Sequence, residues 1–213
     1  MSERQRANQK AQGAFTATTK EELRLPRLLV LTDRTICGRP LVDVVTDAVV
    51  SGARAVVLRE KDLPDDERVR IAAQLRRVLD PVGGVLLLAG PRGDAVHLSA
   101  SDLVPFPRPV LVGRSCHDAG EVARAAAEGC DYVTCSPVFA TASKPGYGPA
   151  LGPGGLAALL TGGPPAYALG GVLPGHAATC RGAGAHGVAV MGPVMRDPQI
   201  VSQYLAALQQ VSA

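Results

Sequence analysis

In the loop that follows residue 135, the sequence sets the hydroxyl groups of Thr141 and Ser143 beside the ammonium group of Lys144. It comes directly after a short run, Tyr132-Val133-Thr134, that is typical of a strand, and its prolines and glycines favour turns. Two hydroxyl donors next to a cation at a strand end can bind the oxygens of a phosphate group. An ordinary solvated loop has a similar composition, so the spacing alone leaves both interpretations open.

Lysine usage favours the phosphate interpretation. The chain has four lysines against eighteen arginines, and two of the lysines, Lys61 and Lys144, follow hydrophobic runs. Lysine is a compact, flexible point charge that suits phosphate, whereas arginine binds it bidentately. Chance placement is the alternative. If both lysines lie at strand ends, they can meet at one edge of a sheet.

Composition limits the class of protein. The 213 residues suit one domain, and the apolar residues are mainly Ala, Val and Leu with many glycines, which favours parallel strands covered by helices. The net charge of +3 comes without a basic run, so no nucleic-acid partner is expected. No apolar stretch reaches the roughly 18 residues of a membrane span, and the N-terminus lacks the apolar region of a secretory signal. No membrane association is therefore expected.

The five cysteines are odd in number and include no Cys-x-x-Cys pair, which predicts reduced thiols and a cytoplasmic protein. Cys116 and Cys135 fall near strand ends, but His117 is the only neighbour that could activate a thiol, so a catalytic cysteine is disfavoured. Residues 1–24 are polar and predict a disordered N-terminal extension, with residues 25–213 forming a single domain.

Apolar runs alternate with helical patterns along the rest of the chain. The predicted strands are 28–33, 55–58, 85–88, 95–98, 110–113, 132–135, 166–169 and 187–191, and the predicted helices are 41–52, 65–79, 118–129, 155–160, 176–182 and one starting at 197. Strict alternation implies parallel strands, and eight strands close a TIM (β/α)8 barrel of the α/β class. An open doubly wound sheet is the alternative, but no G-x-G-x-x-G motif opens the first helix.

One connection is too short for a helix. Only residues 89–94 separate the third and fourth strands, so we predict that the third helix is missing or shortened. Val85, Leu87 and Val96 would then form an exposed apolar strip, covered by a homodimer partner or by another segment such as part of residues 1–24.

Working residues of such barrels lie at the carboxyl ends of the strands. There the sequence places the cations Arg59, Lys61, Arg114 and Lys144, which we expect on one rim. Glycines 170, 171 and 192 follow the last two strands, where backbone N–H groups commonly bind phosphate.

Several ordered motifs resemble one family, the thiamine phosphate synthases with their relatives the thiazole tautomerases. The matching segments are Leu58-Arg59-Glu60-Lys61, Val96-His97-Leu98 with Asp102, Gly113-Arg114-Ser115-Cys116-His117, Asp131-Tyr132-Val133 through Lys144-Pro145-Gly146, Ala168-Leu169-Gly170-Gly171, and residues 183–190. The resemblance spans nearly all of the chain from Leu28 to Pro198. It implies a TIM barrel that joins a pyrimidine methyl diphosphate to a thiazole phosphate and releases pyrophosphate with the help of Mg²⁺.

The resemblance also implies roles for individual residues. The positions that hold the diphosphate correspond to Arg59, Lys61, Ser115, Thr141, Ser143 and Lys144; those on the thiazole-phosphate side correspond to Gly170, Gly171, Met191 and Gly192; and a magnesium-ligand position corresponds to Asp102. Small phosphorylated thiazole or pyrimidine compounds are the partners that it implies.

The chain also departs from the family pattern. Ala89-Gly90 stands where the synthases carry Asn-Asp, one of them a magnesium ligand, and Val57 stands where they carry a pyrimidine-contacting Gln. Pro137 replaces the histidine of the tautomerases. Three functions therefore stay open: a Mg²⁺-assisted transferase, a non-catalytic or regulatory phosphate-binding relative, and a tautomerase with a substitute base.

The histidines offer one acid–base candidate. His117, after the Gly-Arg-Ser turn, is the best one, whereas His97 on the fourth strand is expected in the core. His176 is expected to cap a helix, and His186 to be structural at the opposite end of the barrel.

Overall fold

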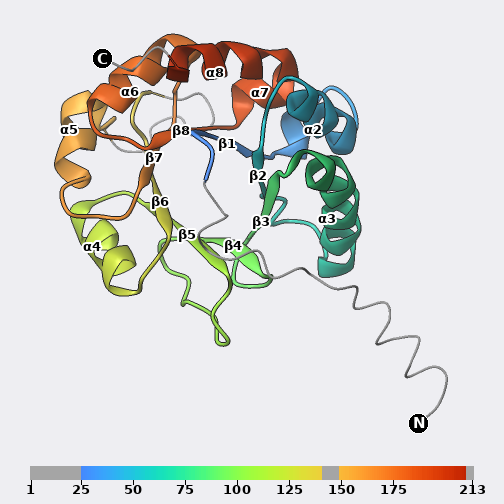
Figure 1. Ribbon diagram of the computed structural model, residues 1–213. Coiled ribbons are helices and arrows are strands. Elements are labelled where there is room, and N and C mark those ends of the chain that lie inside the picture. Colours follow the sequence, from blue (N-terminus) through green and yellow to red (C-terminus); the bar gives the residue numbers. More distant parts are fainter. Residues whose placement is uncertain (1–24, 141–148, 210–213) are drawn as a thin grey trace.

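Eight parallel strands close into a barrel with helices around its outside, as the sequence predicts (Figure 1). The computed structural model describes residues 25–140 and 149–209. The strands are β1 (Leu28–Leu31), β2 (Ala55–Leu58), β3 (Val85–Ala89), β4 (Ala95–Leu98), β5 (Leu111–Cys116), β6 (Tyr132–Cys135), β7 (Ala166–Leu169) and β8 (Gly187–Val190). Each strand pairs with the next in the chain, and β8 pairs with β1.

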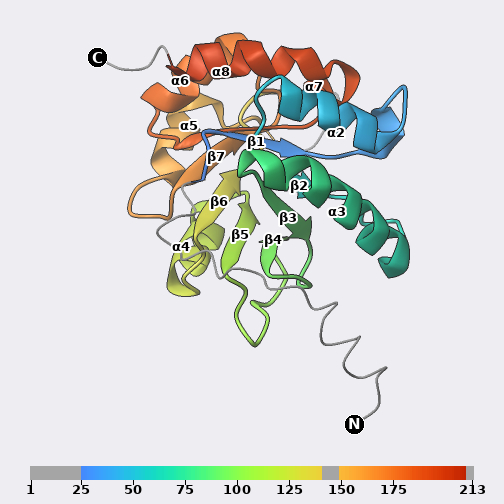
Figure 2. The ribbon, with the colours of Figure 1, turned by 45° about the vertical axis from the view of Figure 1, so that its right-hand side comes forward.

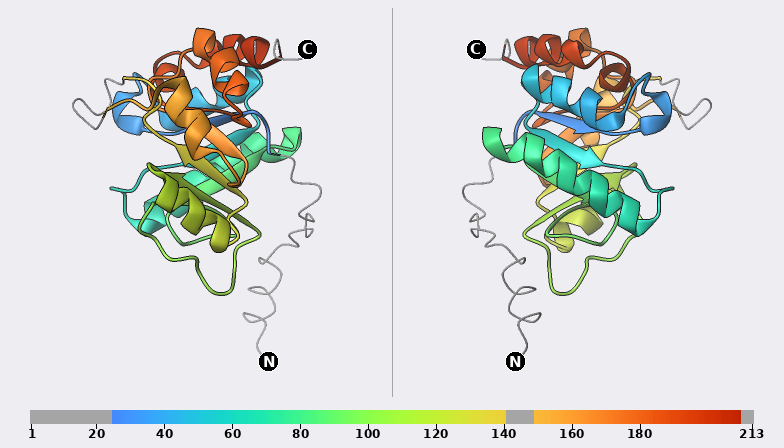
Figure 3. Two further views of the ribbon diagram at one scale, coloured as in Figure 1. Left: turned by 90° about the vertical axis from the view of Figure 1, so that its left-hand side faces the viewer. Right: turned by 90° about the vertical axis from the view of Figure 1, so that its right-hand side faces the viewer.

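The helices cover most of the barrel, as the side views show (Figures 2 and 3). They are α2 (Leu41–Val50), α3 (Asp65–Leu79), α4 (Ala119–Ala127), α5 (Gly152–Leu159), α6 (Ala177–Gly182), α7 (Gly192–Arg196) and α8 (Val201–Gln209). The short α7 was not predicted. At α4 the predicted cap is confirmed, because the Asp118 carboxylate accepts a hydrogen bond from the backbone N–H of Glu121 at 2.8 Å.

Alternate residues of each strand belong to two separate clusters. One cluster fills the barrel and includes Leu29, Val57 and Tyr132, whereas the other packs between strands and helices and includes Val30, Val56 and Val133. This alternation follows from the pleat of a strand, whose successive side chains point to opposite faces. It decides which polar residue at a strand end reaches the interior of the barrel.

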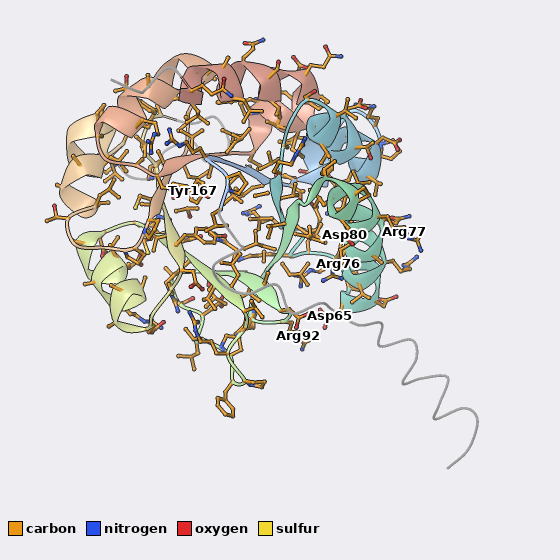
Figure 4. All side chains as sticks on the ribbon, in the orientation of Figure 1. Asp65, Arg76, Arg77, Asp80, Arg92 and Tyr167 are labelled. Atoms are coloured by element: carbon orange, nitrogen blue, oxygen red, sulfur yellow. The ribbon has the colours of Figure 1, made fainter. Side chains whose placement is uncertain are left out.

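The connection between β3 and β4 contains no helix, which confirms that prediction (Figure 1). A connection of a few residues without a helix is long enough to reach the start of β4. Leu88 pairs with Val96 and Ala89 pairs with His97, so β4 starts beside the end of β3. The connection is fixed by a hydrogen bond of 3.0 Å from the Gly90 N–H to the His97 carbonyl. An ion pair between Arg92 and Asp65 ties it to the start of α3 (Figure 4).

The predicted apolar strip on this connection is wrong. Val85 and Leu87 belong to the cluster inside the barrel, and both Leu87 and Val96 are fully buried. The outward residues of β3 are Leu86 and Leu88, which are half-buried against the outer cluster. The exposed apolar surface that was predicted to form a homodimer contact is therefore absent from the described residues. The oligomeric state stays a prediction.

Residues 25–27 close the amino-terminal end of the barrel. The Tyr167 hydroxyl donates to the Pro26 carbonyl at 2.6 Å, and the ring of His186 lies 2.9 Å from the Leu25 carbonyl. The Val188 N–H donates to the Arg27 carbonyl at 2.9 Å. His186 therefore has the structural position expected of it.

The structure also bears on the cysteines and on membrane-spanning helices. All five cysteines are free thiols, as predicted. Among the described helices, none is long and apolar enough to cross a membrane.

Candidate active site

Two cations, Arg59 and Lys61, follow the carboxyl end of β2. Arg59 is half-buried and Lys61 is exposed. The charges of both lower the pKa of His97, which lies inside the barrel. Arg59 continues the alternation of Ala55 and Val57, whose side chains belong to the cluster inside the barrel. The backbone N–H of Arg59 donates to the buried Thr32 hydroxyl at 2.9 Å, which attaches this strand end to β1.

An ion-pair network fixes the loop that carries Lys61. Glu60 is buried and accepts from the backbone N–H of Arg34 at 3.2 Å, and its carboxylate also pairs with the Arg34 guanidinium at 3.2 Å. The same guanidinium binds Asp62 through hydrogen bonds of 2.8 and 2.7 Å. These contacts with Asp62 and then Glu60 raise the pKa of Arg34, which stays charged. Arg34, Glu60 and Asp62 were not predicted, because no pattern in the sequence pairs residues so far apart.

The buried His97 lies between two hydroxyl groups. Its Nδ1 lies 2.9 Å from the Tyr132 hydroxyl, and its Nε2 lies 3.0 Å from the Ser115 hydroxyl. Burial first, and then the charges of Lys61 and Arg59, lower its pKa from 6.5 to about 3, so His97 is neutral. Its position in the core confirms the expectation for His97, and its contact with Ser115 connects that core to a predicted site residue.

Arg114 does not lie on the rim, contrary to expectation. It is fully buried on the outer side of β5 and donates to the carbonyls of Ser99, Ala100 and Asp102 at 3.1, 3.1 and 2.8 Å. It also pairs with Glu128. The predicted strand ended at residue 113, so Arg114 was expected to be a loop residue. In the structure β5 continues to Cys116, and the pleat of the strand points Arg114 outward. Its role is to hold the loop that carries Asp102.

Asp102 is half-buried in the loop after β4. Its Oδ2 accepts from the Ser99 N–H at 2.7 Å. Burial raises its pKa, but the hydrogen bonds from Ser99 and the charges of Lys61 and Arg114 outweigh burial and lower the pKa overall. Asp102 is therefore an ionised carboxylate.

The residues around Asp102 offer a metal ion few ligands. Within residues 25–140 and 149–209, no three His, Cys, Asp or Glu side chains are grouped so that they could hold a metal ion. Mg²⁺ commonly takes only one or two protein carboxylates and completes its shell with water and substrate phosphate. Asp102 fits that limited role, and Ala89-Gly90 supplies no side-chain oxygen.

His117 follows β5 and is half-buried. Its Nδ1 lies 2.8 Å from the Ser136 carbonyl, and its backbone N–H donates to Glu121 at 2.6 Å. Because a carbonyl oxygen only accepts, Nδ1 carries the proton and Nε2 is the basic nitrogen. That arrangement is compatible with acid–base chemistry at Nε2.

The glycines after β7 lie directly against the loop after β6. Gly170 and Gly171 have φ values of 92° and 64°. The Phe139 N–H donates to the Gly170 carbonyl at 2.9 Å, and a Cβ on Gly171 would lie 2.3 Å from the Ala140 carbonyl oxygen. Glycine is therefore required for the two loops to approach this closely. His176 accepts from the Leu173 N–H at 3.2 Å, as expected of a cap.

Met191 and Gly192 follow β8, and Gly192 is the first residue of α7. Thr141, Ser143 and Lys144 lie outside the described residues, so the structure does not place them. Of the predicted site residues, Ser115 contacts the buried His97, while Arg59 and Lys61 follow β2 and Asp102 follows β4, all after the carboxyl ends of their strands. The described part of the site is the carboxyl-terminal end of a closed eight-stranded parallel barrel, which places the protein in the class of (β/α)8 barrels.

Comparison with known proteins gives the family. The family model described as thiamine monophosphate synthase matches residues 28–194. A candidate thiamine-phosphate synthase of Geobacter sulfurreducens is 38% identical over 190 residues, covering 80% of this chain and 87% of that protein. The thiamine-phosphate synthase of Methanoculleus marisnigri is 33% identical over 203 residues, covering 87% of this chain and 95% of that protein.

Structural comparison agrees. The solved structure of a thiamine phosphate pyrophosphorylase from Pyrococcus furiosus has a TM-score of 0.76 at 25% identity and covers 88% of this chain and 97% of its own. The chain belongs to the thiamine monophosphate synthase family, a family of thiamine biosynthesis.

Proposed function

We propose that this protein joins a hydroxymethylpyrimidine diphosphate to a thiazole phosphate and releases pyrophosphate. The observation that supports this most is that Arg59 and Lys61 follow the carboxyl end of β2, while Ser115 near the carboxyl end of β5 contacts the buried His97. Two relatives that are 33% and 34% identical to this chain are named thiamine-phosphate synthases.

The proposed reaction breaks the bond between the pyrimidine methylene carbon and the diphosphate oxygen. Both electrons of that bond leave with the diphosphate, and the pyrimidine ring spreads the positive charge left on the carbon. The ring nitrogen of the thiazole then donates its lone pair to this carbon, which forms the new bond and leaves the thiazole ring positively charged. Catalysis then depends mainly on neutralising charge that develops on the leaving oxygens. Arg59 and Lys61 supply positive charge there, and Ser115 supplies a hydroxyl donor. Thr141, Ser143 and Lys144 complete the anion site in this proposal.

The thiazole phosphate is proposed to bind on the other side of the mouth. Gly170, Gly171, Met191 and Gly192 lie at the carboxyl ends of β7 and β8. Barrels of this class commonly bind phosphate there through backbone N–H groups.

Mg²⁺ is proposed to bind weakly, held by Asp102 and by diphosphate oxygens. When bound, the ion would neutralise part of the leaving-group charge. Because Asp102 is the one side chain expected to hold Mg²⁺, Arg59 and Lys61 are proposed to neutralise more of the leaving-group charge than the ion does. His117 is proposed as the acid–base group nearest the mouth. The five free thiols support a cytoplasmic location.

The test is direct. Purified protein is incubated with both substrates and Mg²⁺, and thiamine phosphate is measured by mass spectrometry together with released pyrophosphate. Equal amounts of both products are expected. Pyrophosphate binding without either product would instead indicate a non-catalytic phosphate-binding protein.

A further inference from the structure

A continuous line of polar side chains inside the barrel ends at Ser115. The Tyr132 hydroxyl lies 2.9 Å from His97 Nδ1, and His97 Nε2 lies 3.0 Å from the Ser115 hydroxyl. Tyr132 and His97 are 0% and 5% exposed, and their rings stack with centroids 5.6 Å apart. Ser115 is half-buried. Two buried side chains thus contact a hydroxyl group that lies nearer the mouth.

The geometry has a specific origin in the sequence. Gly113 pairs with both His97 and Tyr132 on the neighbouring strands, and a Cβ at this position would lie 2.0 Å from the Tyr132 ring. The absence of a side chain at Gly113 therefore gives the tyrosine ring room to reach across β5 to the histidine of β4. The same strand then presents Ser115, two residues on and on the same face.

The direction of these hydrogen bonds can be derived. Tyr132 is fully buried, and within the described residues its hydroxyl has no hydrogen-bond partner except His97 Nδ1. A buried phenol proton needs an acceptor, and burial raises the pKa of Tyr132, so the proton stays on it. Tyr132 therefore donates to Nδ1. A neutral imidazole that accepts at Nδ1 carries its proton on Nε2, so His97 donates to Ser115.

The consequence falls on Ser115. Its oxygen accepts from His97, so its own proton cannot be directed at that ring. We propose that Tyr132 and His97 are positioning residues that keep the Ser115 hydroxyl as a hydrogen-bond donor toward an anionic ligand at the mouth. The inference rests on the proposed function for the identity of that ligand, but the order of the hydrogen bonds does not depend on it.

The electrostatic surroundings support this arrangement. A protonated His97 would donate from both nitrogens and leave the Tyr132 proton without an acceptor. Burial opposes that state most, followed by the positive charges of Lys61 and Arg59, while Asp102 favours it. The cations that would bind a diphosphate thus also keep His97 neutral.

A double-mutant cycle tests the proposal, with inorganic pyrophosphate as the probe in calorimetry. Tyr132→Phe removes only the phenol oxygen, and we expect pyrophosphate affinity to fall about fivefold, as for one misdirected hydrogen bond. In the Ser115→Ala background the same change should have no further effect, because the hydroxyl that it orients is gone. Tyr167→Phe is the matched control, since that hydroxyl bonds to Pro26 at the closed end of the barrel (Figure 4). It should leave the affinity unchanged.

Nitrogen NMR of the His97 ring supplies a second measurement that needs no ligand. We expect a protonated Nε2 and an unprotonated Nδ1 in the wild type, and a change of the Nδ1 signal in Tyr132→Phe but not in Tyr167→Phe. A proton on Nδ1, or equal losses of affinity for Tyr132→Phe with and without Ser115, would overturn the proposal. A wild type that neither binds pyrophosphate nor forms thiamine phosphate, with the expected ring signals, would overturn the proposed function and leave the hydrogen-bond order confirmed.

Discussion

At the scale of single residues, the cations at the mouth carry the proposed binding of diphosphate. Arg59→Ala and Lys144→Ala should each weaken pyrophosphate binding by about 1.5–3 kcal/mol, because each removes charge-assisted hydrogen bonds. Calorimetry measures the change, and Arg77→Ala on the outer side of α3 is the control (Figure 4). Unchanged affinity in both the Arg59 and the Lys144 variant would contradict the proposed anion site.

Asp102 makes a second prediction at this scale. Because Ala89-Gly90 supplies no carboxylate, Mg²⁺ should raise pyrophosphate affinity by less than about tenfold. Asp102→Ala should abolish what enhancement there is. Titrations with and without Mg²⁺ measure both effects. A large enhancement that disappears in Asp102→Ala would mean that this one carboxylate forms a much stronger metal site than proposed.

His97 should make stability depend on pH. Its pKa is about 3 in the folded protein and about 6.5 when unfolded, so below pH 6.5 the unfolded chain binds a proton that the folded chain does not. Stability should therefore fall as the pH falls, by about 2 kcal/mol from this group between pH 7 and pH 5. In His97→Gln that part of the pH dependence should be lost. Urea unfolding at both pH values measures it, and equal pH dependence in the two proteins would show that His97 titrates normally.

At the scale of elements, β5 depends on a missing side chain. Gly113→Ala would place a Cβ 2.0 Å from the Tyr132 ring. We expect a loss of about 1–3 kcal/mol in the free energy of unfolding, as for other overpacked cores. Gly154→Ala in α5, whose Cβ would meet nothing within 4 Å, should be neutral or slightly stabilising. Denaturant unfolding compares them. Equal stability of the two variants would mean that the tyrosine ring can move aside.

The elements also show what the sequence predicts well. Helix α3 has the predicted bounds, and each strand overlaps its predicted range, because buried apolar runs bounded by glycine or polar residues are a strong signal. The prediction of which β3 side chains point outward was wrong, because the run Val-Leu-Leu-Leu-Ala is apolar at every position and shows no alternation. The prediction for Arg114 was wrong for a related reason. A charged residue after an apolar run normally indicates the end of a buried strand, so the sequence did not indicate that β5 continues through Arg114.

At the scale of the whole molecule, the chain needs residues 25–27 to close the barrel. Deleting residues 1–24 should leave the midpoint of thermal unfolding nearly unchanged. Deleting residues 1–27 should lower it by several degrees, because Tyr167, His186 and Val188 lose their hydrogen-bond partners. Equal midpoints for the two deletions would show that these three contacts do not stabilise the closed end.

More of the overall fold than of the candidate site could be predicted from the sequence. Strand count and alternation predict a barrel, and the family motifs predict which strand ends carry function. The network of Arg34, Glu60 and Asp62 joins the segments that follow β1 and β2, and the line from Tyr132 to Ser115 joins β6, β4 and β5. Such contacts follow from strand register inside a closed barrel, and local patterns carry no information about register.

The turnover of the protein with both substrates tests the central claim most directly. The claim predicts that the wild type forms thiamine phosphate and pyrophosphate in equal amounts. In Lys61→Ala the turnover number should fall about a hundredfold or more, as when a group that stabilises transition-state charge is removed, while Arg77→Ala keeps the wild-type rate. No product from the wild type, or a Lys61→Ala variant as fast as the wild type, would contradict the account.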